Sequence, residues 1–318
     1  MPISKAAKER FETSVSKLLK DDEKLGLAVS GGPDSLALLA LAHAVMPDRI
    51  AVATVDHGLR AEAKDEAAMV VELCEKRGIA CEVLTAKWAK PPKTNVQARA
   101  RHQRYALLAD WARREKLPAI ATAHHADDQV ETLLMRLLRG AGVSGLSGIK
   151  RVRRLSPSLR IVRPLLDFPR EDLLQVVKAA RMTPVEDPSN EDDHHDRVRL
   201  RKALSQADLG DPMRIAATAR YLAEADRALD WMTNGLADIR LTGEGDALLL
   251  DPEGLPREIM RRLMRMGIAR LGDRPPRGPE LNRLIVGLTQ GRTATLGTLK
   301  FSPAGKQWRI EKAPARKG

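Results

Sequence analysis

The first segment that could do chemistry reads Ser-Gly-Gly-Pro-Asp-Ser and lies at residues 30–35. An apolar run at 25–29 precedes it and a leucine-rich run at 36–45 follows it, so we predict a strand, a glycine turn and a helix. The first N–H groups of a helix lack partners within the helix and carry partial positive charge. We expect the turn to bind an anion such as phosphate; an ordinary turn in which Asp34 or Ser35 caps the helix is the alternative.

A second polar segment combines two histidines with three acids. His124 and His125 precede Asp127, Asp128 and Glu131, and acids three or four residues apart share one side of a helix. Such a carboxylate cluster suits Mg²⁺ or an ammonium group, whereas acids that only complement the helix dipole are the alternative. A transition-metal site is a weaker interpretation, because the matching histidine pair at 194–195 lies in a charged loop.

Two smaller groups also have chemically useful side chains. Asp56 and His57 follow an apolar run, where a carboxylate could hold Mg²⁺ or polarise a reacting group, and a strand-end cap is the alternative. Arg101 and Arg104 lie three residues apart beside Tyr105 and give a helix a cationic side that could contact phosphate. A solvated helix face would show the same pattern.

The elements that must position these residues alternate along the first part of the chain. Apolar runs predict strands near residues 25–29, 50–55, 79–84 and 118–123. Between and after them, helical patterns lie near 36–45, 62–77, 96–114 and 127–139. The alternation predicts an α/β, Rossmann-like fold with a mostly parallel sheet and helices on both faces. Ligands bind at the carboxyl ends of the strands in such sheets, so we expect the polar segments to converge there.

The pattern changes after residue 139. We expect the glycine-rich segment at 140–148 to be a mobile loop over the site rather than a linker. A further helix is predicted near 170–181, and from residue 207 helical runs predominate near 212–239, 256–271 and 279–288. Strand-like pieces lie near 247–250 and 293–310. We therefore predict a catalytic domain at 1–206 and a smaller, mainly helical domain at 207–318.

The charge balance indicates a polyanionic partner. Lys and Arg outnumber Asp and Glu by 54 to 42, and the net charge of +12 suits nucleic acid, although extra charge can serve solubility alone. On the helix expected at 256–271, Arg257, Arg261 and Arg265 recur every four residues. This stripe could grip RNA phosphates, and a plain amphipathic surface helix is the alternative.

Cysteine usage and hydropathy bear on the compartment. Cys74 and Cys81 form no CxxC pair, which argues against a disulfide framework or a cysteine-held metal. No run approaches the roughly 20 apolar residues of a membrane span, and residues 1–20 lack a secretory core. We expect a cytoplasmic protein with no membrane association, and a homodimer is compatible with the sequence.

Several motifs together resemble one family. The glycine turn is similar to the pyrophosphate-binding loop, or PP-loop, of enzymes that split ATP into AMP and pyrophosphate. Further matches narrow the resemblance to the tRNA(Ile)-lysidine synthetases. They are Val-Asp-His-Gly-Leu-Arg at 55–60, Arg-x-x-Arg-Tyr at 101–105, His-His-x-Asp-Asp-x-x-Glu-Thr at 124–132, Arg-Pro-Leu at 163–165 and Asp-Pro-Ser-Asn at 187–190. Val198 departs from the family, which usually has Asn there.

The resemblance implies a ligase that uses ATP and Mg²⁺ to join free L-lysine to the wobble cytidine of the isoleucine tRNA with a CAU anticodon. The cytosine is first adenylated with release of pyrophosphate, and lysine then displaces AMP. A tRNA thiolase of the same fold is the rival enzyme, but it needs sulfur-carrying cysteines, and neither Cys74 nor Cys81 lies in the marked segments. A non-catalytic RNA-binding protein is the rival of another class.

The residues and the resemblance together lead to one assignment of the site. For ATP we expect Ser30, Gly31, Gly32, Pro33, Asp34 and Ser35, and for catalysis Asp34, Asp56 and His57. Lysine is assigned to Asp128 and Glu131, and Mg²⁺ to Asp34 and Asp127. The expected tRNA contacts are Arg101, Arg104, Arg197, Arg201, Arg257, Arg261 and Arg265.

Overall fold

The computed structural model describes residues 2–59, 62–88, 94–185, 199–200 and 211–314. Packing divides the chain into two compact units, Met1–Ala223 and Glu224–Gly318. The domain boundary predicted at 206/207 falls outside the described residues and stays a prediction. Within the described ranges, no helix is long and apolar enough to span a membrane.

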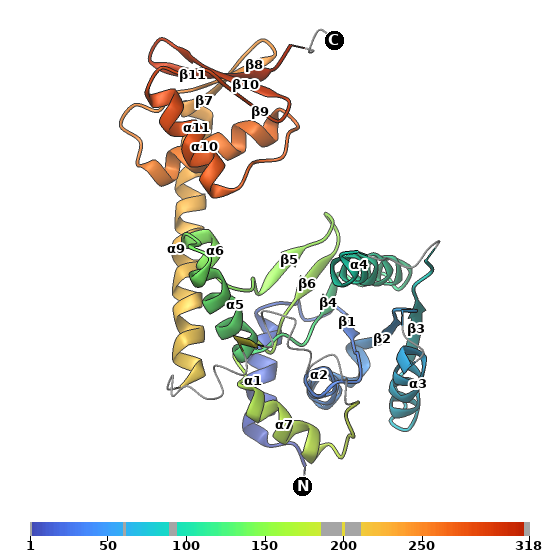
Figure 1. Ribbon diagram of the computed structural model, residues 1–318. Helices are drawn as coiled ribbons and strands as arrows, with labels where there is room; N and C mark the ends of the chain where they lie inside the picture. The colour runs from blue at the N-terminus through green and yellow to red at the C-terminus, as the bar shows by residue number, and fades with distance from the viewer. Residues whose placement is uncertain (1, 60–61, 89–93, 186–198, 201–210, 315–318) are drawn as a thin grey trace. The chain divides into compact units, whose positions relative to one another are not determined.

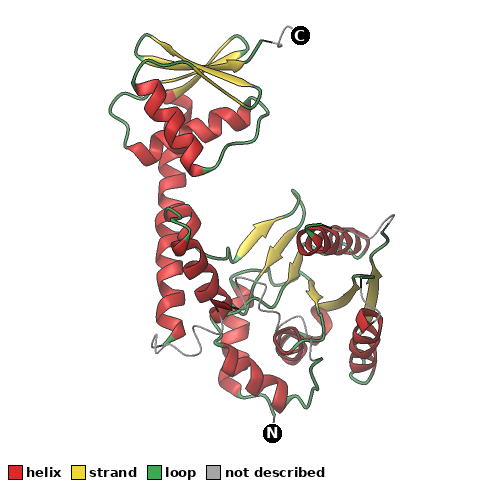
Figure 2. Cartoon of the chain, viewed as in Figure 1, coloured by secondary structure: helices red, strands yellow, loops and turns green. Residues whose placement is uncertain are grey.

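A six-stranded sheet forms the centre of the first unit (Figures 1 and 2). In spatial order its strands are β3 (Cys81–Thr85), β2 (Ile50–Asp56), β1 (Leu25–Ala28), β4 (Ala119–Ala121), β6 (Arg160–Val162) and β5 (Val152–Arg154). Neighbouring strands pair in parallel, except that β5 is antiparallel to β6 and forms one edge. The predicted α/β fold and its four strands are confirmed. Strands β5 and β6 were not predicted, because each is short and carries arginine rather than an apolar run, and β5 is exposed along its whole length.

Helices cover both faces of this sheet, as predicted. They are α1 (Lys5–Ser16), α2 (Pro33–Val45), α3 (Glu62–Glu75), α4 (Val96–Arg114), α5 (Ala126–Leu138) and α7 (Arg170–Ala179), with a 3-10 turn η1 (Pro47–Arg49). One core packs α1, α2, α3 and α7 on the face of the sheet that bears Leu27, and the other packs α4 on the face that bears Ile120. A Cβ at Gly26 would lie 2.8 Å from the Trp111 ring, so only glycine lets β1 and α4 approach so closely.

The structure corrects the prediction of a mobile loop at 140–148. Residues Val143–Leu146 form a short helix, α6. Arg136 of α5 donates hydrogen bonds to the carbonyls of Gly145 at 2.6 Å and Gly148 at 3.0 Å. Gln129, on the same helix, bonds both the N–H and the carbonyl of Ile149. The segment is fastened along α5 through main-chain atoms, which leave no pattern in the side-chain sequence.

The position of Gly148 allows a test of this attachment. Its φ is +67°, and a Cβ there would overlap the amide oxygen of Gln129. We expect Gly148→Ala to lower the free energy of unfolding by about 2 kcal/mol, measured by urea denaturation. Gly140→Ala is the matched control: its φ is +68° and nothing lies within 4 Å of its Cβ position, so we expect only the cost of the left-handed backbone, about 1 kcal/mol. Equal losses would show that the Gln129 contact does not hold the segment.

The second unit combines helices with a five-stranded antiparallel sheet. Helix α9 (Pro212–Arg240) runs across the division between the units, and α10 (Arg257–Arg270) and α11 (Gly278–Thr289) belong to the second. The sheet order is β7 (Leu241–Glu244), β8 (Ala247–Leu250), β11 (Gln307–Lys312), β10 (Leu299–Ala304) and β9 (Ala294–Leu296). The predicted helices are confirmed, and the strand-like pieces form a larger sheet than we expected. Ile259 and Leu263 of α10 pack in its core.

Candidate active site

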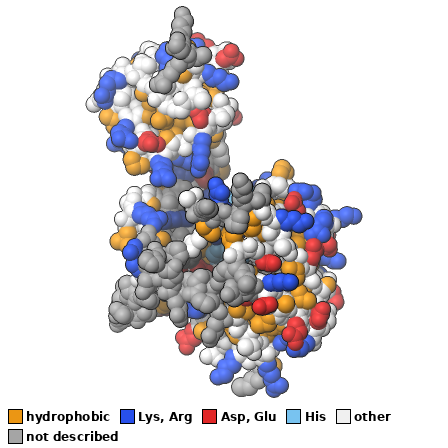
Figure 3. All heavy atoms as spheres, turned by 45° about the vertical axis from the view of Figure 1, so that its right-hand side comes forward, with side chains coloured by type: hydrophobic (Ala, Val, Ile, Leu, Met, Phe, Trp, Pro, Cys, Tyr) orange, Lys and Arg blue, Asp and Glu red, His pale blue; other side chains and the backbone are white. Residues whose placement is uncertain are grey.

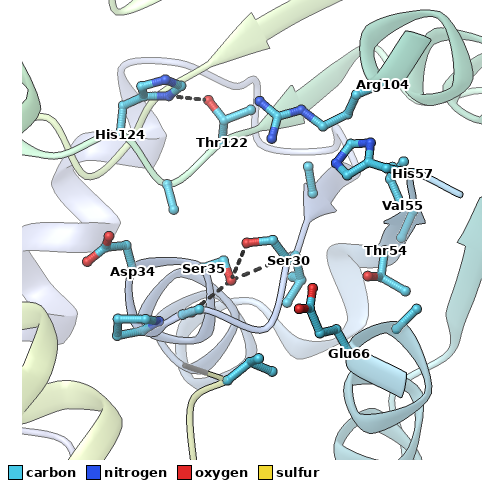
Figure 4. A pocket seen from close by; sticks show the side chains of 18 of the residues that line it. Ser30, Asp34, Ser35, Thr54, Val55, His57, Glu66, Arg104, Thr122 and His124 are labelled. Atoms are coloured by element: carbon cyan, nitrogen blue, oxygen red, sulfur yellow. Dashed lines mark hydrogen bonds between the residues drawn. The ribbon is translucent and has the colours of Figure 1, made fainter. Parts of the chain in front are cut away.

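The carboxyl ends of β1, β2 and β4 border a cavity of about 480 Å³ in the first unit. Figure 4 shows Ser30 and Ser35 on one side of it and Thr122, His124 and Arg104 on the other. Its polar lining comes from several stretches of chain and includes Ser30, Asp34, Ser35, His57, Glu66, Arg101, Arg104, Thr122, His124, Asp128 and Arg170. Three segments far apart in the sequence therefore share one cavity, as the topology of a parallel sheet predicts.

The glycine turn is built to leave its N–H groups open. Gly31 has φ +84°, and a Cβ there would lie 2.9 Å from Val185, so this position requires glycine. Helix α2 begins at Pro33, and its N-cap residue, Gly32, has no side chain to cap the helix. The Ser35 hydroxyl instead closes the turn, donating to the Gly32 carbonyl at 2.9 Å and accepting from the Ser30 N–H at 3.1 Å. This geometry favours anion binding over the alternative of a side-chain cap.

A buried histidine joins the acids of two segments. His125 is 2% exposed, and its Nε2 lies 3.5 Å from Asp34 Oδ2 and 3.7 Å from Asp128 Oδ2. Its Nδ1 lies 3.4 Å from Asp127 Oδ2. Burial by itself lowers the pKa of His125, but the close carboxylates of Asp127 and Asp34 and the charge of Asp128 outweigh it and raise the pKa to about 10. His125 is therefore a fixed cation that draws three carboxylates together.

The neighbouring histidine, His124, is uncharged. Burial and the charges of Arg163, Arg101 and Arg104 lower the pKa of His124 to about 4, against the attraction of Asp128. The ring is therefore neutral at pH 7, and its Nδ1 lies 2.9 Å from the Thr122 hydroxyl. Neither histidine was assigned a role from the sequence. Nothing in the sequence shows that the three aspartates surround His125.

The charge of His125 predicts a pH dependence of stability. Its pKa of about 10 in the folded chain exceeds the ordinary value of 6.5, so the folded state holds one extra proton between those two values. The stabilisation is complete below pH 6.5 and is lost as the pH rises through 10, with a slope of about a kcal/mol per pH unit. Urea denaturation across this range measures the slope.

The variant His125→Gln should remove that slope and lower stability at pH 7, because the three carboxylates would then repel one another with no cation between them. Substitution of the exposed His102 on α4 by glutamine is the control and should leave the slope unchanged. If His125→Gln keeps the wild-type slope, the imidazole is not protonated in the folded chain.

Asp34 is suited to a divalent cation. One of its carboxylate oxygens faces His125, while the other, Oδ1, is buried without a hydrogen-bond partner among the described residues. Asp127, the other predicted metal ligand, uses Oδ2 to accept the Arg170 N–H at 2.8 Å. In the part of the chain that the structure describes, no three His, Cys, Asp or Glu side chains form a metal site by themselves. Mg²⁺ would therefore need phosphate oxygens as further ligands, which is its common mode of binding.

The two residues assigned to lysine differ in position. Asp128 lines the cavity. Its Oδ2 accepts a hydrogen bond from the main-chain N–H of His125 at 3.0 Å, and this bond also caps α5. Glu131 is 3% exposed on the same helix and is not part of the cavity lining. The spacing predicted that both acids share one face of the helix. In the structure Asp128 faces the cavity, whereas Glu131 is buried behind it.

Strand β2 ends at Asp56 and His57 follows it, but only His57 lines the cavity. Asp56 Oδ1 accepts the Gly58 N–H at 2.8 Å and so shapes a turn in which Gly58 has φ +60°. His57 lines the cavity (Figure 4), and its carbonyl accepts the indole N–H of Trp88 at 2.7 Å. A catalytic role for either residue stays a prediction.

The predicted RNA-binding arginines fall into three groups. Arg101 and Arg104 line the cavity from α4, and Arg197 and Arg201 lie outside the described residues. On α10, Arg257 and Arg265 are exposed, whereas Arg261 is half-buried and bound to Glu258 at 2.5 Å. On the face of the molecule that Figure 3 shows, Lys and Arg side chains are spread among acidic and apolar ones. Charge alone therefore marks no single RNA-binding surface on the face shown.

Comparison with known proteins adds an independent observation. Residues 5–208 match the PP-loop domain family ATP_bind_3. The tRNA(Ile)-lysidine synthase of Novosphingobium aromaticivorans is 48% identical over 291 residues, which cover 91% of this chain and 88% of that relative. The tRNA(Ile)-lysidine synthase of Zymomonas mobilis is 42% identical over 298 residues, covering 92% and 90%.

The structural comparison bears on the fold. The U34-tRNA thiolase of Methanococcus maripaludis matches with a TM-score of 0.57 over 69% of this chain and 78% of that chain, at 18% sequence identity. That identity shows a shared fold and no more. The matches to the synthases, by contrast, run along nearly the whole length of both chains. With its PP-loop, its parallel sheet and this extent of identity, the chain belongs to the tRNA(Ile)-lysidine synthase, or synthetase, family of ATP-using PP-loop enzymes.

Proposed function

We propose that this chain uses ATP to join free L-lysine to the wobble cytidine of the isoleucine tRNA with a CAU anticodon, forming lysidine. The observation that supports this best is that an open glycine turn, an acidic helix start and two arginines face one cavity. These features suit the three substrates: phosphates of ATP, ammonium groups of lysine and the RNA backbone. The modified tRNA would read AUA instead of AUG.

In the first step, the 2-carbonyl oxygen of the cytosine attacks the α-phosphorus of ATP, and the bond to the β-phosphate breaks to release pyrophosphate. The N–H groups at the start of α2 would bind the phosphates, with Gly31 and Gly32 allowing their close approach. Asp34 would hold Mg²⁺ through its buried Oδ1, with Asp127 as the second candidate ligand. When bound, Mg²⁺ would offset the negative charge of the phosphates.

In the second step, the deprotonated side-chain amine of lysine attacks C2 of the adenylated base, and AMP leaves with the former carbonyl oxygen. Asp128 lines the cavity and would bind an ammonium group of lysine, with Glu131 behind it on α5. His57 would contact the reacting base in the cavity. Asp56 would support catalysis indirectly, because its carboxylate holds the turn that positions His57.

The RNA would contact both units. Arg101 and Arg104 would meet it at the cavity, and Arg257 and Arg265 are the exposed members of the α10 stripe. Arg261 would first have to leave Glu258, so we rank it below them. The reaction is assigned to the cytoplasm, where tRNA, ATP and free lysine are present together, and a homodimer is compatible with it.

The direct test is to incubate the protein with radiolabelled lysine, ATP and total tRNA. We expect label to enter tRNA only with ATP, with pyrophosphate released in equal amount, and not to enter a tRNA whose wobble cytidine is replaced by uridine. RNA binding without pyrophosphate release would instead indicate a non-catalytic RNA-binding protein.

A thiolase would give a sulfur-containing nucleoside in the same incubation with a sulfur donor. The positions of the cysteines do not favour it: Cys74 is buried in a core and Cys81 is half-buried, and neither lines the cavity.

A further inference from the structure

Four arginines from two parts of the chain gather around one aromatic ring beside the cavity. The guanidinium carbons of Arg153, Arg101 and Arg104 lie 5.0, 5.2 and 5.6 Å from the centre of the Tyr105 ring. Arg163 follows β6, is 3% exposed, and acts on the same phenol by its charge. Tyr105 is itself buried, and its hydroxyl accepts a hydrogen bond from Arg101 at 3.3 Å. Cation–π contacts with one fixed ring therefore orient this Tyr105 cluster.

The arginines of the Tyr105 cluster form no ion pair with an acid of the described residues. Among the ion pairs of the described residues, none involves Arg101, Arg104, Arg153 or Arg163. Burial raises the pKa of Tyr105, but the four guanidiniums outweigh it and lower the pKa below its ordinary value. Arg163 donates to the Lys150 carbonyl, and its buried Nε has no partner within the described ranges. Unbalanced guanidinium groups at this density suit a ligand with several anionic oxygens, such as a phosphate.

The sheet register explains how Arg153 reaches this ring. On the edge strand β5, Arg153 lies opposite Ile161 of β6, and Ile161 packs in the same core as Tyr105 and the rest of α4. Arg154 lies opposite Arg160, and successive residues of a strand point to opposite faces. Arg153 is therefore on the α4 face of the sheet and Arg154 on the other, although both are exposed.

The position of the cluster distinguishes between two sources of phosphate. The open N–H groups of the glycine turn are suited to ATP, and Arg104 lies across the cavity from Ser35 of that turn (Figure 4). Arg153 is not part of the cavity lining but lies on the exposed edge strand. The cluster thus runs from the cavity wall to the surface, as a site for an extended anion would.

We propose that Arg153, together with Arg101 and Arg104, binds a backbone phosphate of the RNA next to the nucleotide that enters the cavity. This inference rests on the proposed function, in which RNA is the substrate. It adds a residue of the β5–β6 hairpin, which no sequence motif marks, to the RNA-binding surface.

The test compares Arg153→Gln with Arg154→Gln, two neighbouring changes that remove the same charge from the same exposed strand. The affinity for tRNA is measured across a salt series. For Arg153→Gln we expect the affinity at low salt to fall about fivefold to tenfold. Loss of one phosphate contact should also flatten the log–log salt slope by about 0.7 to 0.9. For Arg154→Gln we expect less than about a twofold change in affinity.

The affinity for ATP, measured by equilibrium dialysis without tRNA, should be the same in both variants and the parent protein. If the two variants weaken tRNA binding equally, the Tyr105 cluster is not a phosphate site and the inference is wrong. An equal loss of ATP and tRNA affinity in Arg153→Gln would assign the cluster to ATP and overturn it as well. Lysine incorporation by the parent protein tests the proposed function separately. If the parent protein incorporates no lysine but binds tRNA through Arg153, the proposed function is wrong and the role of Arg153 stands.

Discussion

Replacing Asp34 by asparagine is expected to lower the rate of pyrophosphate release at least about 100-fold while tRNA binding stays within about twofold. Asparagine keeps the size of the side chain but loses its charge. Its single neutral oxygen can face either the protonated His125, which lies 3.5 Å from the aspartate, or a cation beside the phosphates, but not both, and it supplies no negative charge to either. A coupled assay of pyrophosphate release with saturating tRNA and lysine measures the effect.

Asp56→Asn is the matched control for this prediction. An asparagine oxygen can still accept the Gly58 N–H, so the turn that presents His57 should persist. We expect a rate within about tenfold of the parent protein, because the carboxylate acts through the shape of the turn. Near-normal turnover by Asp34→Asn would remove that residue from the mechanism. A loss in Asp56→Asn as large as that in Asp34→Asn would place the Asp56 carboxylate in direct contact with the reaction.

The second large effect is expected at Asp128. The variant Asp128→Asn should raise the KM for lysine about 10- to 100-fold, the cost of losing one charged hydrogen bond, and leave the KM for ATP within about twofold. The asparagine oxygen can still accept the His125 N–H and so keep the cap of α5. Initial rates with lysine and ATP varied in turn separate the two constants.

Glu131→Gln offers a comparison on the same helix. Glu131 is buried behind the cavity, so its variant should lower stability as well as lysine affinity. Asp128→Asn removes one of the charges that stabilise the protonated His125, so it should lower stability too, but it should raise the KM for lysine more than Glu131→Gln does, because only Asp128 lines the cavity. If ATP use alone suffers in Asp128→Asn, the carboxylate belongs to the metal and the assignment to lysine is wrong.

Features that depend on neighbouring residues could be predicted from the sequence. The strand, glycine turn and helix around Gly31 and Gly32 follow from local backbone requirements, so this turn could be predicted before any fold was known. Helix α4 was predicted with its observed bounds, because its pattern runs over several turns. The convergence of three segments on one cavity also followed, since parallel strands end at the same edge of a sheet.

Features that depend on contacts across the chain could not be predicted in this way. The segment at 140–148 looked mobile because its glycines leave no side-chain pattern, yet Gln129 and Arg136 bind its backbone. Strand β5 is exposed at all three residues and two of them are arginines, so no apolar pattern marks the hairpin that carries Arg153.

The sequence by itself determined the glycine turn, the acidic helix start and the order of the elements, because these follow from residues close together in the chain. Only the tertiary structure decided which charges meet. Three aspartates surround His125 and hold its proton, while His124, one residue away, faces arginines and stays neutral. Protonation depends on burial and on charges within a few ångströms, and the fold brings those charges from distant parts of the chain.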